Sequence, residues 1–60
     1  MDKMTTTLGE YSFSKYTDSS TVIVAKEGKN IEPFVHHGIG SNYGSFVNAC
    51  IEHKEELEGN

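Results

Sequence analysis

Cysteine and histidine side chains that could bind a metal lie in the second half of the chain. Cys50 and His53 are spaced i, i+3, so on a helix they share one side. His36 and His37 precede them and offer further zinc ligands. Adjacent residues of a regular strand point to opposite faces, so only one of these two histidines can join the helical pair. Structural zinc sites are usually built from paired units such as C-x-x-C or H-x-x-x-H, and this chain has only one incomplete unit of this kind. We therefore predict no metal and no cofactor.

A cysteine near a histidine, such as Cys50, could also act as a catalytic nucleophile. Such catalysis needs an activated thiolate in a cleft. Cys50 lies near the middle of an apolar stripe, where burial raises the pKa of a thiol. Glu52, Glu55 and Glu56 supply several carboxylates, but general acid–base catalysis needs environments that separate two pKa values. A solvated helix face offers no such environment, so we predict that the protein is not an enzyme.

Glycine recurs at Gly38, Gly40 and Gly44, between a predicted strand and a predicted helix. Phosphate-binding loops occupy this position, because the free backbone N–H groups there attract anions. The spacing is G-x-G-x-x-x-G rather than the dinucleotide fingerprint, and no Walker lysine follows it. The segment is therefore interpreted as a flexible strand-to-helix connection.

An acidic run closes the sequence, with Glu52, Glu55, Glu56 and Glu58 in the last turns of the predicted helix. A helix C-terminus prefers cations, so these charges oppose the helix dipole. Two interpretations stay open: a solvated, frayed helix end, or an acidic ridge for a basic partner, since blocks of like charge are often interaction tails. Asp18 and Glu27, in predicted turns, are expected to extend such a ridge.

These residues need a scaffold, and its clearest element is a helix over residues 42–58. Apolar side chains recur there at helical spacing, at Tyr43, Phe46, Val47, Cys50, Ile51 and Leu57. Ser41 or Asn42 is expected to cap its N-terminus.

The rest of the chain predicts strands and turns. Strands are expected at residues 8–16, 21–26 and 31–37, and residues 1–7 are expected to be flexible. Pro33 cannot donate to a strand ladder, which places the third strand at an edge or a bulge. The predicted architecture is a single α+β domain over residues 1–60, a three-stranded antiparallel β-meander packed by one C-terminal α-helix (β-β-β-α).

Charge and size narrow the function. The 60 residues include nine acidic residues, five lysines and no arginine, for a net charge of −4. A basic footprint is usual for nucleic-acid binding, so its absence weighs against direct contact with nucleic acid. The lone cysteine and the absence of long apolar runs predict a cytoplasmic protein that neither crosses nor binds a membrane. So small a core predicts either a homodimer or docking on a larger partner.

We therefore predict a small acidic protein-binding module that regulates or inhibits a larger basic protein. A sharper version has its carboxylates imitate a nucleic-acid backbone, as an inhibitor encoded by a phage or a mobile element would. The alternative is a nucleic-acid-binding domain that uses an exposed sheet face. That face would present aromatic and lysine side chains: Tyr11, Phe13, Tyr16, Lys15, Lys26 and Lys29.

In architecture, the predicted order of elements is similar to the small arm-binding domains of phage integrases. Such a resemblance implies DNA recognition by a basic three-stranded sheet, which an acidic chain without arginine does not supply.

Overall fold

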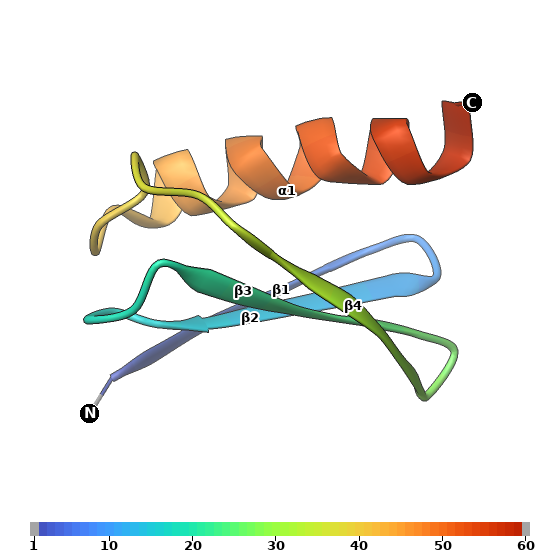
Figure 1. The fold of residues 1–60 in the computed structure, drawn as a ribbon, viewed down its shortest axis with the longest axis horizontal. Coiled ribbons are helices and arrows are strands. Elements are labelled where there is room, and N and C mark those ends of the chain that lie inside the picture. Colours follow the sequence, from blue (N-terminus) through green and yellow to red (C-terminus); the bar gives the residue numbers. More distant parts are fainter. Residues whose placement is uncertain (1, 60) are drawn as a thin grey trace.

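The computed structural model describes residues 2–59, and it shows a four-stranded antiparallel sheet with one C-terminal helix (Figure 1). The elements are β1 (Lys3–Leu8), β2 (Tyr11–Tyr16), β3 (Thr21–Lys26), β4 (Lys29–Val35) and α1 (Tyr43–Gly59). The strands pair in chain order, β1-β2-β3-β4. The α+β class, the antiparallel sheet and the C-terminal helix are confirmed, but the sheet has four strands where three were predicted.

The additional strand is β1, in the segment predicted to be flexible. Its threonines have a high β-propensity but give little contrast between an apolar and a polar face, so the alternation that marks a strand was weak. Leu8 pairs with Tyr11, which leaves Gly9 and Glu10 as a two-residue turn. Gly9 has a φ of 62°, as the first central position of a type II′ turn requires. The predicted strand over 8–16 is therefore the end of β1, a turn and β2.

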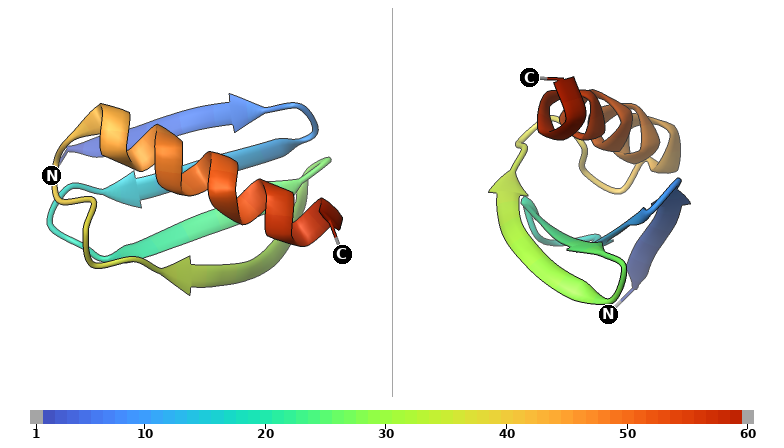
Figure 2. Two further views of the ribbon diagram at one scale, coloured as in Figure 1. Left: turned by 90° about the horizontal axis from the view of Figure 1, so that it is seen from above. Right: turned by 90° about the vertical axis from the view of Figure 1, so that its right-hand side faces the viewer.

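Alternating side chains give the sheet one face that packs against the helix. Met4 of β1, Tyr11 and Phe13 of β2 and Val22 and Val24 of β3 are all buried. The sheet curves around α1, so that β1 and β4 rise on either side of the helix (Figure 2). The second sheet face is open, and exposed Ile23 lies on it.

The last strand carries the irregularity that Pro33 predicted. Val22 pairs with Phe34 and Val24 pairs with Ile31, so Glu32 and Pro33 together oppose one residue of β3. This bulge lies in β4, an edge strand. Because proline has no N–H to donate, this position avoids the loss of a hydrogen bond inside the sheet. The strand was expected at an edge or a bulge and has both. It runs over Lys29–Val35 rather than the predicted 31–37, so His36 and His37 follow it.

Helix α1 starts one residue later than predicted, after an Asn42 cap. The Asn42 side chain accepts a hydrogen bond from the Ser45 N–H at 2.9 Å. The buried positions of the helix are Phe46, Ala49 and Cys50. No helix of the described residues is long and apolar enough to cross a membrane.

Candidate partner-binding face of the helix

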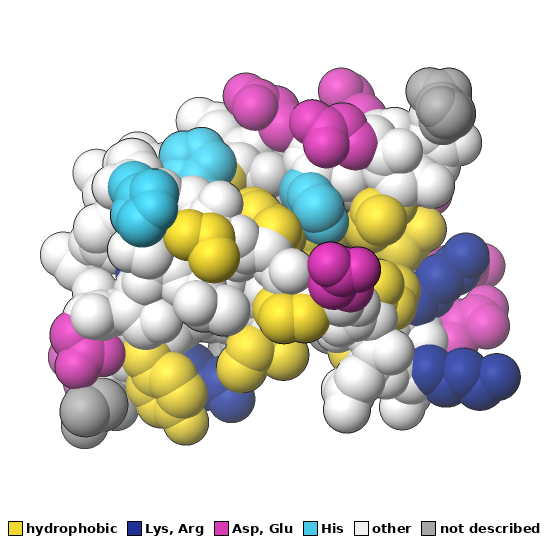
Figure 3. Space-filling view, viewed as in Figure 1, with side chains coloured by type: hydrophobic (Ala, Val, Ile, Leu, Met, Phe, Trp, Pro, Cys, Tyr) yellow, Lys and Arg dark blue, Asp and Glu magenta, His cyan; other side chains and the backbone are white. Residues whose placement is uncertain are grey.

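The glutamates predicted to bind a partner lie on the solvent side of α1. Glu52, Glu55, Glu56 and Glu58 are all exposed, and acidic side chains line the outer edge of the helix (Figure 3). Phe46, Ala49 and Cys50 turn toward the sheet, which leaves these carboxylates directed away from it. No basic residue lies in the last turn of α1. This face therefore presents a locally negative surface.

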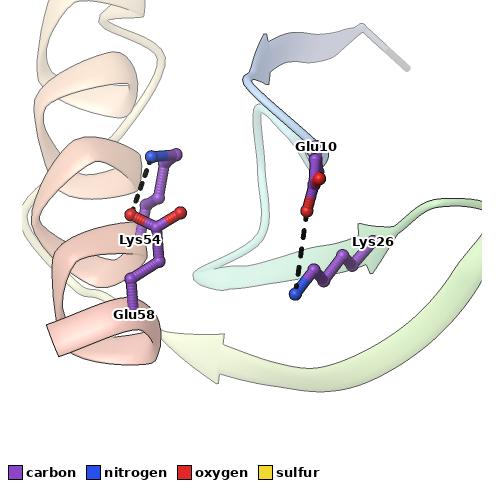
Figure 4. A network of polar contacts seen from close by, with 4 residues as sticks. All are labelled: Glu10, Lys26, Lys54 and Glu58. Carbon is purple, nitrogen blue, oxygen red and sulfur yellow. Dashed lines mark hydrogen bonds and ion pairs between the residues drawn. The ribbon is translucent and has the colours of Figure 1, made fainter. Parts of the chain in front are cut away.

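One of the four glutamates differs from the rest because it has a counter-ion. Lys54 Nζ lies 3.0 Å from Glu58 Oε1, and within residues 2–59 the only other ion pair is Glu10–Lys26 at 3.8 Å (Figure 4). The Lys54 stem passes Gly9 in the β1–β2 turn, and its ammonium is 6.0 Å from the centre of the Tyr11 ring. Lys54 thus faces the sheet, and Glu52, Glu55 and Glu56 have no ion-pair partner among the described residues.

The two acidic residues in turns do not join this surface as a group. Asp18 follows β2, in the turn before β3, and Glu27 follows β3. The six residues of β3 separate them by roughly 20 Å, at about 3.3 Å per residue. They lie at opposite ends of the sheet, so the two residues cannot extend the acidic surface of α1 together at the same end.

The structure divides the alternative, sheet-based site. Tyr11, Phe13 and Lys15 are buried on the face that α1 covers, so they are not an exposed nucleic-acid platform. The cause is the phase of β2: its odd-numbered residues point to the helix, and sequence alternation alone does not say which face is covered. Tyr16 points the other way and is exposed, as is Lys29 at the start of β4.

Lys15 is the least expected member of that set, because its side chain is 1% exposed. Its ammonium donates to the Gly40 carbonyl oxygen at 2.7 Å and to the Tyr16 carbonyl oxygen at 2.9 Å. The Thr17 carbonyl oxygen lies at 3.5 Å. Backbone carbonyls thus take the place of a carboxylate, and they tie β2 to the connection before α1.

Lys26 lies on the same side of the sheet as α1 rather than on the outer face, with its side chain 42% exposed. Its ammonium lies 5.3 Å from the centre of the Tyr11 ring and pairs with Glu10. The outer face of β1–β3 is instead lined largely by serine and threonine hydroxyls around a shallow hollow of about 320 Å³. The six residues predicted for the alternative site therefore do not form one surface.

The residues considered for metal or nucleophilic chemistry are held in other contacts. His53 stacks on Phe34, with ring centres 3.9 Å apart, and His36 Nδ1 accepts a hydrogen bond from the Gly38 N–H at 3.2 Å. Cys50 is fully buried, as its place in the apolar stripe predicted, and burial raises the pKa of its thiol from 9.0 to about 11. No cluster of three metal-ligating side chains occurs among the described residues.

An exposed apolar stripe on α1 was missed by sequence reasoning. Tyr43, Val47 and Ile51 follow one another at i, i+4 and i+8, and the sequence placed all three in the apolar stripe expected to pack on the sheet. Tyr43 and Ile51 are exposed and Val47 is half-buried, because the sheet takes the neighbouring stripe that contains Ala49 and His53. The helical periodicity marks the apolar arc but does not show which part of it the sheet covers.

Comparison with protein families, with characterised proteins and with solved structures finds no match for this chain.

Proposed function

We propose that this protein is a non-enzymatic binding module that regulates or inhibits a larger basic protein through the outer face of α1. One observation carries the proposal. Glu52, Glu55 and Glu56 lie exposed within two turns of α1, and none of them has an ion-pair partner among the described residues.

Holding these charges there has a cost in stability. Carboxylates in the last turns of a helix oppose its dipole by a few tenths of a kcal/mol each. Glu52 and Glu56 are also an i, i+4 pair of like charge, which adds a similar amount. An arrangement that weakens the helix yet leaves three carboxylates facing water is well suited to attract a basic surface.

The chemistry of the remaining groups supports binding rather than catalysis. A buried thiol with a pKa of about 11 is protonated at neutral pH, so Cys50 is a poor nucleophile. His53 is stacked on Phe34 instead of being paired with Cys50 as a base. The glutamates face water on the outer side of the helix and, among the described residues, do not line a cleft that could hold a substrate.

The finer form of the proposal names the partner's own ligand. Residues i, i+3 and i+4 on a helix are about 5–6 Å apart at Cβ, so Glu55 and Glu56 each lie close to Glu52 and the three carboxylates form a compact negative cluster. Such a cluster resembles neighbouring phosphates of a nucleic-acid backbone, and the target would be a protein whose basic groove binds nucleic acid. The module would then act by occupying that groove.

The test is a tagged pull-down from a host lysate, run with and without nuclease. The wild type is compared with the triple variant E52K/E55K/E56K. The matched control is D2K/E10K/E32K, which changes the net charge equally at exposed positions outside the helix and outside the predicted turn residues Asp18 and Glu27. Circular dichroism confirms that each variant is folded.

A stoichiometric protein partner that survives nuclease, is lost with the helix triple and is kept by the control supports the proposal. Recovery of nucleic acid, or of proteins that disappear with nuclease, favours the sheet-based alternative. Equal retention by both triples overturns the role of the acidic face.

A further inference from the structure

The exposed apolar stripe of α1, formed by Tyr43, Val47 and Ile51 and called here the apolar ridge, lies next to the acidic face. Its members are spaced by one turn each and span about 12 Å at 1.5 Å per residue. Tyr43 is 54% exposed and Ile51 is 40% exposed. Aligned apolar side chains on one helix face are the feature by which amphipathic helices enter a groove in a partner.

The aromatic end of the ridge is held in place although it faces water. The Tyr43 hydroxyl donates to the Thr5 carbonyl oxygen of β1 at 3.2 Å. Its ring also packs against Phe46, with ring centres 6.0 Å apart. An exposed tyrosine that is already ordered loses little entropy on binding, which is typical of interface anchors.

Charge is distributed unevenly about the ridge. At 100° per residue, Glu55 and Glu52 follow Ile51 on the outward side, whereas the other side meets β1 and its threonines. A partner that covers the ridge therefore meets the carboxylates of Glu52 and Glu55 along the outward border, where neither is paired among the described residues. Along the other border it meets the Lys54–Glu58 ion pair and β1.

We infer that the apolar ridge is the centre of the partner contact. The occupant is a basic protein with an apolar groove and lysine or arginine side chains along one border of that groove. This inference rests on the proposed function and adds the partner's shape and charge pattern to it. A second copy of this chain is a poorer occupant, because its own helix carries the same negative border.

The experiment uses a synthetic amphipathic helical peptide of leucine and lysine, labelled for fluorescence polarisation, as the probe. Wild type is compared with I51S and with I23S, a matched control because Ile23 is 45% exposed on the outer sheet face. A fourth protein, E55Q, removes one border charge. Light scattering reports the oligomeric state of each.

We expect I51S to weaken peptide binding about tenfold, as loss of a central anchor does, while I23S binds like wild type. We expect E55Q to weaken binding less and to reduce its salt dependence. Equal binding by I51S and I23S would contradict a role of the apolar ridge in the partner contact. If E55Q still weakens binding in that case, the proposed role of the acidic face is retained and only the role of the ridge is rejected. A wild-type dimer that I51S dissociates overturns the assignment to a basic partner.

Discussion

At the scale of single residues, Lys15 is the position where side-chain type and surroundings differ most. A buried ammonium without a carboxylate partner requires other acceptors, since an unpaired charge in the interior is costly. The Gly40 and Tyr16 carbonyl oxygens supply them, and the first of these bonds crosses from β2 to the connection that leads into α1. Lys15 thus fixes the start of the helix as well as the end of its own strand.

We predict that K15M lowers the free energy of unfolding by about 1–3 kcal/mol, because buried carbonyl oxygens lose their donor. The exposed substitution K29M is the control and should stay within about 0.5 kcal/mol of wild type. Urea denaturation followed by circular dichroism measures both. A K15M protein as stable as wild type would show that desolvation of the ammonium offsets its hydrogen bonds.

Cys50 makes stability depend on pH at the alkaline end. The folded thiol has a pKa of about 11 against 9.0 ordinarily, so the unfolded chain releases this proton first as the pH rises. The contribution is fully present below pH 9 and is lost between pH 9 and about 11. Two pKa units correspond to roughly 2–3 kcal/mol.

Thermal melts from pH 8 to pH 11 should therefore fall more steeply for wild type than for C50V, which keeps a buried apolar side chain of similar size. Every other ionisable side chain is the same in both proteins, so the difference between the two curves isolates the thiol. Parallel curves would contradict the assignment of this pH dependence to Cys50.

At the scale of elements, the N-terminus of α1 depends on one side-chain hydrogen bond. N42A removes the acceptor for the Ser45 N–H, and we expect a loss of about 1 kcal/mol. N48A, at an exposed position inside the same helix, should be neutral or slightly stabilising, because alanine has the higher helix propensity. A chemical denaturation series that finds equal effects would show that Asn42 does not act as a cap.

The β3–β4 turn carries a conformation unsuited to its residue. Glu27 has a φ of 52° and Gly28 a φ of 81°, the pattern of a type I′ turn, in which asparagine followed by glycine is preferred. E27N should raise the free energy of unfolding by about 0.5–1 kcal/mol, because asparagine adopts the left-handed backbone conformation at a lower cost than glutamate. E10N is the control, because Glu10 is not among the positive-φ residues. Equal effects on unfolding would contradict the strain at Glu27.

At the scale of the whole molecule, the acidic face of α1 should trade stability for binding. E52Q/E55Q/E56Q removes three charges that oppose the helix dipole and one another, so we expect it to be more stable by a few tenths of a kcal/mol per residue at low salt. Added salt should raise the melting temperature of wild type and narrow this gap, because screening weakens the repulsion. A variant that is less stable than wild type at every salt concentration would show that the glutamates make stabilising contacts.

Much of the scaffold was predictable because local sequence specifies it. The continuous β-branched run at 21–26 forms β3 with the predicted bounds, and Pro33 lies at both an edge and a bulge. The helix was located to within one residue, and Asn42 was one of two expected caps. β1 was missed because three consecutive threonines at residues 5–7 give no apolar contrast between the two faces, so their strand state depends on pairing with β2.

The candidate site was only partly predictable for a geometric reason. The sequence alone determined two features of the site. The net negative charge of the protein follows from its composition, and the position of the carboxylates on the outer arc of α1 follows from helical periodicity. The rotation of α1 about its axis, and the choice of sheet face that it covers, depend on packing between segments far apart in the chain. Only the tertiary structure could bury Lys15 and leave Tyr43 and Ile51 in water, because local patterns mark which residues share a face but not what that face meets.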